Sequence, residues 1–518
     1  MQFLTISPIL IPLAAAALTA LFWGRPVIQR WIGLAGAVAL LAACGALVAQ
    51  VLDGSVLVAQ MGDWPAPFGI AIVIDLLSAI MLTIAGVMAV AVAVYAMGPG
   101  AIERDRAGFQ PLFHSLMLGV CGSFSTGDLF NLYVWFEVML IASFGLLVLD
   151  RTKEQLDGGL RYVMLNLVGT TFFLLAVGLI YGMTGTLNLA ELAQIAPTVE
   201  NQGALAAVGA LLLVAFGAKA AVFPLFNWLP AAYHTASMPV AAIFAALLTK
   251  VGVYAIIRLF TLVYAHDTAF FGPILQAVAI LTMVTGVLGA AAQSDIRRIL
   301  SFHIISQIGY MLVGVALLTP LALAGSVLYL IHHIVVKANL FLIAGAVRQE
   351  GGSFALARLG GLWIAKPVLA VLFLIPALSL AGLPPFSGFW SKLAVIQSGL
   401  EAEAYILAGS ALLVGVLTLY SMTKIWNEAF WKAAPDRQEA PAAPWTGAQK
   451  FACYAPIVAL AGVTMTIGLW TEPFAATAMH AGEMLLNTDA YITAVLGDQP
   501  AAPAQLAATD LTTQEINR

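Results

Sequence analysis

The stretch NLYVWFEVMLIASFGLL, residues 131–147, has the composition of a membrane-spanning helix and contains a single charged side chain, Glu137. A helix needs about 20 mostly apolar residues to cross the hydrocarbon core of a bilayer. An ionised carboxylate at that depth is costly, and such residues usually face a bundle interior or a hydrated path. Glu137 is therefore a candidate functional residue, provided that the rest of the chain also lies in a membrane.

The composition of the whole chain indicates a membrane environment. Of 518 residues, 61% are hydrophobic and 9% are charged, whereas a soluble domain carries about 25% charged residues. The net charge of −4 comes without a basic patch, so nucleic acid is not an expected partner. The three cysteines lack metal-ligand spacing, and we expect neither a metal nor a cofactor. The apolar N-terminus lacks a basic leading region and is expected to remain as a first span.

Apolar segments of sufficient length predict an all-α polytopic membrane protein with about fourteen transmembrane helices. These segments lie near residues 4–23, 33–52, 70–97, 111–127, 129–149, 160–183, 204–230, 239–262, 271–291, 297–318, 321–346, 367–390, 403–431 and 449–471. Lys and Arg occur in most odd-numbered connections, counted from the N-terminus, and in none of the even-numbered ones. Because cytoplasmic loops carry the basic excess, both termini are predicted to lie outside the cell.

Five basic side chains fall inside predicted spans, where they are costly. Arg258 lies toward the outer end of its segment, and its guanidinium is expected to reach the membrane surface. The other four are too deep for that. Together with one acid and one histidine they form the predicted proton-translocating set: Glu137, Lys219, Lys250, His333, Lys337 and Lys392. His333 and Lys337 are four residues apart and so share one helix face.

The central set contains lysine and histidine but no arginine, which favours proton transfer over static anion binding. Burial favours the neutral forms of a carboxyl group and an amine, whereas pairing favours their charged forms. A small movement of Lys219 away from Glu137 would therefore push a proton toward Lys250. The alternative is a fixed ion pair that only holds the bundle together, and His333 alone could equally be a hydrogen-bonded core residue.

The seventh and twelfth predicted spans contain helix-breaking residues close to a lysine: Pro224 and Pro230 follow Lys219, and Pro384, Pro385 and Gly388 precede Lys392. Proline removes a backbone hydrogen bond, and freed carbonyls are tolerated at membrane depth inside protein or beside a wet cavity. The five-span separation predicts two inverted five-helix repeats, spans four to eight and nine to thirteen. Packing kinks without a function are the alternative.

These features divide the chain into six segments. They are spans one to three at 1–110, the first repeat at 111–264, the second at 265–431, a cytoplasmic linker at 432–448, a last span at 449–471 and an external polar tail at 472–518. Two acids, Asp75 and Asp128, lie near the outer ends of spans, and Asp128 is expected to cap its helix.

Several motifs resemble the antiporter-like subunits shared by respiratory complex I and Mrp-type multisubunit cation/proton antiporters. They are GDLFNLYVWFEVMLIASFGLL, AAVFPLFNWLPAAY, ALLTKVGVYAIIRLF, DIRRILSFHIISQIGYMLVG, LYLIHHIVVKANLFLIAGAV and AGLPPFSGFWSKL, spread over about residues 70–430. Within this superfamily the chain is most similar to the D-type subunits of Mrp antiporters. Complex I relatives commonly have histidine where Gln307 stands, and one has glutamate in place of Lys392.

The resemblance implies a transporter subunit rather than an enzyme, in the bacterial cytoplasmic (inner) membrane. Its implied partners are subunits of the A, B, C, E, F and G types, and its implied substrates are protons and Na⁺ or a similar cation. It assigns Glu137 and Lys219 to a modulating pair, Lys392 to the far end of a hydrophilic axis, and the other bases to its middle. Four residues are of secondary interest: His332, His303, Gln307 and Asp75. No set of oxygen ligands suggests a Na⁺ site, so the cation path is expected in a partner subunit.

Two other functions stay open at this point. The same buried charges would serve a proton-pumping membrane subunit of an NADH:quinone oxidoreductase-type complex, whose redox chemistry lies in other chains. A purely structural scaffold is disfavoured by the cost of the mid-span bases. Neighbouring genes would distinguish the antiporter from the oxidoreductase, since an antiporter needs small membrane subunits and an oxidoreductase needs flavin and iron–sulfur subunits.

Overall fold

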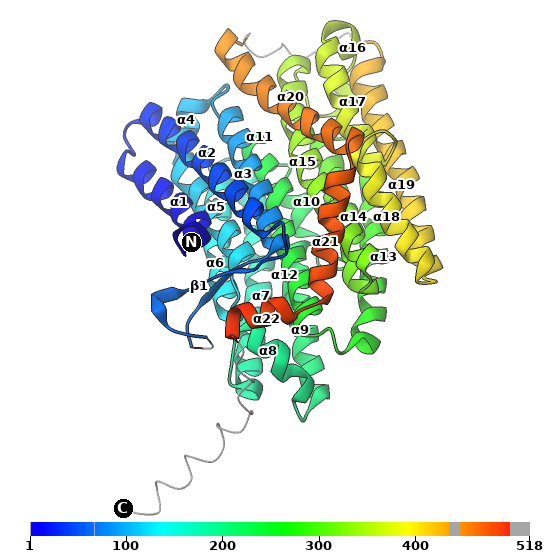
Figure 1. Ribbon diagram of the computed structural model, residues 1–518. Helices are drawn as coiled ribbons and strands as arrows, with labels where there is room; N and C mark the ends of the chain where they lie inside the picture. The colour runs from blue at the N-terminus through cyan, green and yellow to red at the C-terminus, as the bar shows by residue number, and fades with distance from the viewer. Residues whose placement is uncertain (1, 67, 435–444, 498–518) are drawn as a thin grey trace, which may run out of the picture.

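The computed structural model describes residues 2–66, 68–434 and 445–497, and these form a bundle of upright helices with one small β-hairpin (Figure 1). Within these ranges, twelve helices are long and apolar enough to cross a membrane. The predicted all-α membrane fold is therefore confirmed. Two further predicted spans coincide with the 17-residue helix α5 and with the shorter apolar helix α17, and the count of fourteen stays a prediction.

The N-terminal part contributes two outer helices, the hairpin and one buried helix. Its elements are α1 (Gln2–Leu21), α2 (Pro26–Val51), β1 (Leu57–Gln60), η1 (Met61–Asp63, where η marks a short 3₁₀ or π turn), β2 (Ala71–Ile74), α3 (Leu76–Tyr95) and α4 (Ala101–Arg106). The two strands pair antiparallel, with Leu57 opposite Ile74. Helix α3 begins after Asp75, whose side chain accepts a hydrogen bond from the Ser78 backbone N–H.

The following elements cover the residues assigned to the first predicted repeat. They are α5 (Phe109–Ser125), α6 (Leu129–Leu147), α7 (Lys153–Thr184), α8 (Leu189–Ile195), η2 (Ala196–Thr198), α9 (Gln202–Ala220), α10 (Trp228–Ala232), α11 (Met238–Ile243), η3 (Phe244–Leu248) and α12 (Thr249–Leu262). Asp128 caps α6 by accepting from the Asn131 N–H at 2.7 Å, as predicted. Every residue of α12 is buried, so this helix lies in the interior.

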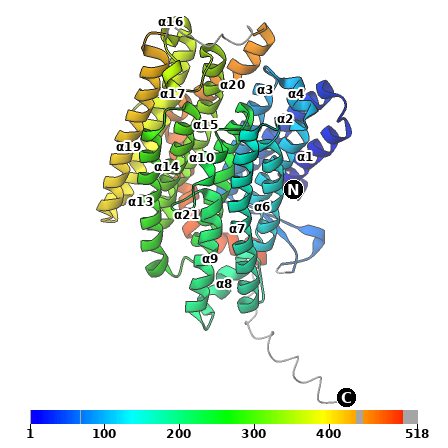
Figure 2. The same cartoon turned by 180° about the vertical axis from the view of Figure 1, so that it is seen from behind.

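The second predicted repeat is built around one of its own members, the long helix α15. The elements are α13 (Thr268–Ala292), α14 (Ile296–Leu317), α15 (Pro320–Gly351), η4 (Leu356–Arg358), α16 (Leu362–Ala365), α17 (Pro367–Ala381), α18 (Ser387–Glu401), α19 (Tyr405–Ile425) and η5 (Trp426–Trp431). Helix α15 packs against α14, α17, α18, α20 and α21. Seen from behind, α7, α13 and α19 stand at the outer surface (Figure 2), where Leu175, Leu288 and Leu412 are exposed.

The C-terminal part differs from the polar tail expected from residue 472 onward. After α20 (Gly447–Leu469) come α21 (Glu472–Leu486) and α22 (Asp489–Leu496), and α21 packs against α15. At 15 residues α21 is too short to be recognised as a span. The small residue Gly482 lets it approach closely, because a Cβ there would lie 2.9 Å from the Pro320 carbonyl oxygen. Most of the predicted linker (435–444) and the end of the tail (498–518) lie outside the described residues.

The bundle has two distinct ends. Helices α4 and α16, which belong to the connections rich in Lys and Arg, lie at the upper end in Figure 1, which we call the basic end. Strand β1 and helices α8 and α22 lie at the opposite end, which we call the hairpin end.

Both predicted helix breaks are present. Helix α9 ends at Ala220, the next residue has a φ of 60°, and α10 starts only at Trp228. Helix α17 ends at Ala381, Gly382 has a φ of 90°, and α18 starts at Ser387. The Trp228 indole N–H donates to the Ala218 carbonyl oxygen at 2.9 Å and so satisfies one carbonyl of the last turn of α9. The inverted relation of the two repeats stays a prediction.

Helices α9 and α12 approach each other very closely at the first break. A Cβ at Gly252 of α12 would lie 2.5 Å from the backbone nitrogen of Ala220 and 2.9 Å from the carbonyl oxygen of Phe216. Backbone atoms cannot move aside as a flexible side chain can, so only glycine fits. This contact sets the distance between the end of α9 and the start of α12.

We expect Gly252→Ala to destabilise the protein by about 1–3 kcal/mol, because it overpacks this contact. The measurement is the apparent melting temperature of the detergent-solubilised protein. Gly178→Ala in α7 is the matched control. Within the described part of the chain no atom lies within 4 Å of a Cβ there, so this substitution should be neutral or stabilising by about 0.5–1 kcal/mol. Equal melting temperatures for the two variants would contradict the close approach.

Candidate functional site

The bases predicted to act in proton transfer lie in the interior of the bundle. Lys219 lies in the last turn of α9, Lys250 is the second residue of α12, His333 and Lys337 lie in α15, and Lys392 lies in α18. Their exposed fractions are between 0% and 5%. Five ionisable groups on four helices are thus enclosed by protein, where each needs polar partners to carry a charge.

Lys219 lies in the last turn of α9, beside the first helix break. Its Nζ is 5.9 Å from the ring centroids of both Phe136 and Tyr162, within the range of cation–π attraction. The C-terminal end of a helix also favours a positive charge. Among the described residues, Nζ has no hydrogen-bond partner. Its position is therefore favourable for a cation, but no strong contact holds the ammonium group there.

Glu137 does not form the direct ion pair with Lys219 that the sequence suggested, within the residues that the structure describes. It is half-buried and lies three residues after Val134 and four before Ile141, which are 37% and 69% exposed. Residues at these spacings share a helix face, so Glu137 lies on the outward face of α6. The two side chains nevertheless come from adjoining parts of α6 and α9, because the ring centroid of Phe136, the residue before Glu137, lies 5.9 Å from Lys219 Nζ.

Lys250 follows a π turn that changes the backbone hydrogen bonding. The π turn η3 ends two residues earlier, and the Lys250 ammonium donates to the carbonyl oxygen of Ala245 within it. Such turns interrupt the regular helical ladder and are frequent at functional sites. The sequence gives no local sign of this turn, although it provides the hydrogen-bond acceptor for the most deeply buried lysine of the first half.

His333 and Lys337, on α15, continue the row of buried bases, which comprises Lys219, Lys250, His333, Lys337 and Lys392. Lys337 Nζ donates to the Leu300 carbonyl oxygen of α14 at 3.1 Å. Neither ring nitrogen of His333 has a hydrogen-bond partner within the described ranges. Helix α15 packs against the π turn η3, which carries the hydrogen-bond acceptor of Lys250, so the row continues from α12 to α15. The described part of the chain therefore offers His333 no protein hydrogen-bond partner, and its role in proton transfer stays a prediction.

Helix α14 contributes His303 and Gln307, which are one turn apart. Both ring nitrogens of His303 also lack partners among the described residues. Gln307 accepts a hydrogen bond from the Tyr329 hydroxyl, and its Nε2 is 3.5 Å from Thr418 Oγ1. Helix α14 packs against both α15 and α18. His303 thus lies on the helix between those of Lys337 and Lys392, while Gln307 is engaged in a neutral hydrogen-bond network.

Lys392 is held by the second helix break. Its Nζ donates to the carbonyl oxygens of Leu380 at 2.9 Å and Ala381 at 3.1 Å, which are orphaned at the end of α17. The ammonium also lies 5.0 Å from the Tyr310 ring centroid. A Cβ at Gly382 would be 2.6 Å from Lys392 Cδ, so glycine provides both the backbone turn and the space for the side chain.

His332 joins α15 to the same break through two serines. Its Nδ1 lies 2.8 Å from Ser387 Oγ, which is 2.9 Å from Ser379 Oγ. The Gly388 N–H donates to Ser379 Oγ at 3.2 Å. A Cβ at Gly388 would collide with the Ser379 carbonyl oxygen. The glycine predicted as a helix breaker therefore allows the two half-helices to approach closely enough for this network.

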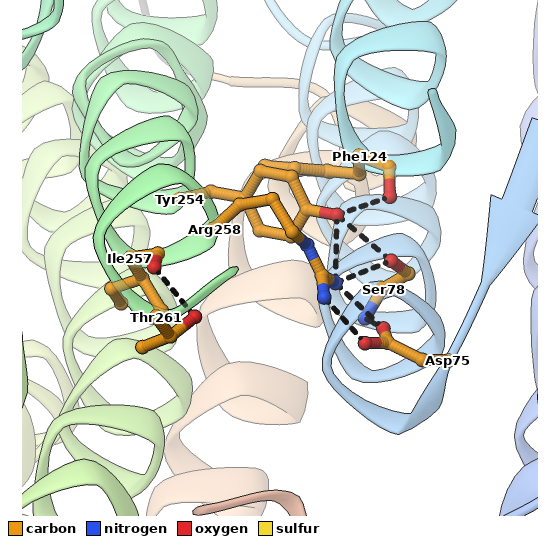
Figure 3. Close-up of polar contacts among 7 residues, drawn as sticks. All are labelled: Asp75, Ser78, Phe124, Tyr254, Ile257, Arg258 and Thr261. Atoms are coloured by element: carbon orange, nitrogen blue, oxygen red, sulfur yellow. Dashed lines mark hydrogen bonds and ion pairs between the residues drawn. The ribbon is translucent and has the colours of Figure 1, made fainter. Parts of the chain in front are cut away.

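Arg258 does not reach the membrane surface, contrary to the expectation from its position near a helix end. It is 5% exposed and forms a two-pronged ion pair with Asp75, with nitrogen–oxygen distances of 2.7 and 2.8 Å (Figure 3). Asp75 is separated from it by 183 residues, so no local pattern could predict the pair. The available signal was the placement of both residues near the outer ends of spans.

A cavity of about 710 Å³ lies where the connections after α6, α10 and α13 meet, apart from the buried bases. His234 lines it, with Nδ1 2.8 Å from the Pro230 carbonyl oxygen and Nε2 3.3 Å from Arg298 Nη2. A carbonyl only accepts and a guanidinium only donates, so the ring is neutral with its proton on Nδ1. Burial and the Arg298 guanidinium lower the pKa of His234 accordingly. No sequence pattern pointed to this histidine, although it closely follows a broken span.

Comparison with known proteins places the chain in a family. The sequence profile described as NADH:quinone oxidoreductase/Mrp antiporter, transmembrane, matches residues 126–418, which contain all the buried bases described above. The chain belongs to this family. The resemblance inferred from the motifs is thereby confirmed.

Three known proteins are similar to this chain over nearly its whole length. The D-type subunit of the Na(+)/H(+) antiporter of Alkalihalophilus pseudofirmus is 42% identical over 496 residues, covering 96% of this chain and all of the relative. A chain in the Mrp complex from Dietzia sp. DQ12-45-1b is 36% identical, with a TM-score of 0.87 and 96% and 99% of the two chains covered. A chain of the archaeal membrane-bound sulfane sulfur reductase is 26% identical, with a TM-score of 0.86 and 96% and 100% covered.

We expect Ser387→Ala to lower stability by about 1–3 kcal/mol, because it removes the hydrogen-bond partner of the buried His332 Nδ1 and the bond to Ser379. The readout is the apparent melting temperature of the solubilised protein. Ser115→Ala is the matched control, since Ser115 Oγ bonds only the Pro111 carbonyl of its own helix among the described residues, and its effect should stay within about 0.5 kcal/mol. A melting temperature for Ser387→Ala equal to that of the control would show that the serine network does not join α15 to the break.

Proposed function

We propose that the chain is the proton-translocating, D-type subunit of a multisubunit antiporter that exchanges Na⁺ or a similar monovalent cation for protons. It works as a transporter subunit and not as an enzyme. Its partners are subunits of the A, B, C, E, F and G types, in a bacterial cytoplasmic membrane, with both termini outside. The observation that carries the proposal is the row of buried bases whose hydrogen-bond partners are neutral.

Neutral partners matter because they leave each base free to change its charge. Lys250, Lys337 and Lys392 donate to backbone carbonyl oxygens, which can accept a hydrogen bond from an ammonium group and, more weakly, from a neutral amine. A lysine paired with a buried carboxylate could lose its proton only by leaving that carboxylate unpaired, which is strongly unfavourable. The observed contacts therefore support reversible protonation rather than a fixed structural charge.

The arrangement also supports an order of transfer. Lys219, Lys250, the His333–Lys337 turn, His303 and Lys392 lie on α9, α12, α15, α14 and α18. Helix α9 packs against α12, α15 packs against the π turn η3 beside Lys250 and against α14, and α14 packs against α18. His303 and His333 have no hydrogen-bond partners within the described residues, so their ring nitrogens are available to receive a proton. Glu137 stands at one end of this row, on the outward face of α6, and Lys392 stands at the other.

The oxidoreductase alternative is less well supported. Identity is 42% and 36% with the antiporter and Mrp relatives and 26% with the respiratory sulfane sulfur reductase chain. Because the same buried bases would serve either complex, this gradient is what favours the antiporter. The two half-helix breaks and the carbonyl-bound lysines are equally compatible with both assemblies.

The proposal is tested by expressing the complete set of antiporter genes in an antiporter-deficient host and measuring Na⁺-driven proton movement in everted vesicles. We expect Glu137→Ala and Lys219→Ala to reduce exchange to less than about a tenth, a barrier increase of more than about 1.4 kcal/mol. The reason is that each removes an ionisable group at one end of the proposed relay. Glu137→Asp should be milder, because it keeps the charge and shortens its reach.

Asp157→Ala is the matched control for these variants, since it removes an acid from an exposed ion pair with Arg161, which contributes little. Native gels must show that each complex assembles. Normal exchange in an assembled Lys219→Ala complex would contradict the relay, and absence of Na⁺-driven exchange in the unmodified complex would contradict the proposed function itself.

We expect Lys392→Arg to stop turnover as completely as Lys392→Ala. Arginine keeps a positive charge beside the carbonyls of α17 but cannot release its proton, since its pKa lies above about 12. The rate of exchange in everted vesicles checks this, with growth at high Na⁺ and alkaline pH as a second readout. A Lys392→Arg variant with a normal rate would show that Lys392 acts as a fixed charge and not as a proton carrier.

A further inference from the structure

A closed network of charged and hydroxyl groups occupies the side of α12 that faces the hairpin end. The Arg258 guanidinium donates to both Asp75 oxygens and lies 3.3 Å from Ser78 Oγ and 3.2 Å from the Tyr254 hydroxyl (Figure 3). The Tyr254 hydroxyl in turn donates to the Phe124 carbonyl oxygen at 2.9 Å. The network therefore joins α12 to α3 and to the end of α5, and all its polar groups are buried.

This network lies on the same helix as one of the buried bases. Lys250, Tyr254 and Arg258 follow each other at four-residue spacing, so they share one face of α12. The face runs from the row of bases toward Asp75, which directly follows strand β2 of the hairpin. Any polar route from Lys250 to the hairpin end along this face must pass the guanidinium.

Two small cavities meet at Arg258. Each has a volume of about 10 Å³, room for about one water molecule. One is lined by Ser123, Thr126 and Tyr254 and reaches Phe216 of α9, near Lys219. The other is lined by Asp75, Thr261 and residues of α21 and α22, toward the hairpin end. Arg258 lines both, so its side chain separates two sites that can each hold a water.

A guanidinium at this position is a specific kind of obstacle. It stays protonated at every physiological pH and has five donors but no acceptor, so a proton cannot be handed on through it. A fixed positive charge in a narrow passage also repels cations and protons, as an arginine does in selective pores. The Tyr491 ring of α22 covers the other side, 5.2 Å from the guanidinium carbon.

We propose that Arg258, held in place by Asp75, is a fixed positive barrier that separates the row of buried bases from the hairpin end of the bundle. This inference rests on the proposed function, because it names the group that keeps the proton path closed on one side during exchange. Without it, water would link the two cavities, and protons would leak from the interior toward the hairpin end without cation transport.

The rival explanation is that the pair only anchors α12 to α3. A buried ion pair is weak evidence for stability, since apolar residues of similar volume often do as well. The two explanations separate when charge and geometry are changed independently. Asp75→Asn with Arg258→Gln removes both charges but keeps an amide–amide contact, and Asn is also a good N-cap for α3. Arg258→Lys keeps the positive charge but loses the two-pronged geometry.

The experiment measures the passive decay of an imposed proton gradient in everted vesicles that contain the whole complex, in the absence of Na⁺. We expect the double variant to leak about tenfold faster than the unmodified complex, which corresponds to a barrier lowered by about 1.4 kcal/mol. Arg258→Lys should leak at the unmodified rate, because the buried Asp75 carboxylate beside it keeps the lysine ammonium charged. A double variant that assembles and stays proton-tight, or a lysine variant that leaks as fast as the double variant, overturns the proposal in favour of anchoring.

If the double variant does not assemble, Arg258→Gln takes its place, because it removes the positive charge while the remaining carboxyl can be neutralised by protonation. Failure of both neutral variants to assemble, with normal assembly of Arg258→Lys, identifies the pair as structural and also overturns the proposal. Na⁺-driven exchange is recorded in the same vesicles. Its absence in the unmodified complex contradicts the antiporter assignment, whereas the comparison of leak rates concerns the barrier alone.

Discussion

The structure depends on how a bundle in a membrane accommodates ammonium groups that lie deep inside protein. A charge in such an interior needs oxygen partners, and regular helices have already used their carbonyls in the helical ladder. The chain meets this need by interrupting helices. Lys250 uses a carbonyl within the π turn η3, and Lys392 uses two carbonyls at the broken end of α17. Irregular backbone thus supplies the hydrogen-bond acceptors of Lys250 and Lys392, whereas Lys337 uses a carbonyl of the regular helix α14.

Much of this arrangement could be predicted because its signals are local. A lysine inside an apolar run is visible in the sequence, and its cost at membrane depth is known. Proline and glycine next to such a lysine indicate a break, and Asp128 before an apolar helix indicates a cap. These inferences need no knowledge of the tertiary structure. They predicted the two helix breaks that the structure shows beside Lys219 and Lys392. The fold class followed from composition and segment length.

The remaining features depend on contacts between distant segments. The pairing of Arg258 with Asp75 joins residues 183 positions apart, and the sequence offered only a surface position for the arginine. The outward direction of Glu137 on α6 depends on which face the other helices cover. Helix α21 was taken for part of a tail because 15 residues are too few for a span. Helix α21 instead packs against the start of α15, where Gly482 permits the close approach.

The Arg258–Asp75 network and the row of buried bases differ in the hydrogen-bond partners of their charged groups. In the network at the hairpin end, Arg258 and Asp75 form an ion pair, and hydroxyl groups supply further hydrogen bonds. These contacts stabilise the charged forms of both side chains. In the row of bases, the lysines contact carbonyls and rings, and His303 and His333 have no partner among the described residues. Changing the protonation state of a buried group costs less free energy when its hydrogen-bond partners are neutral than when they carry the opposite charge. A path for protons and a barrier against them can thus be built in the same helix, with Lys250 and Arg258 two turns apart on α12.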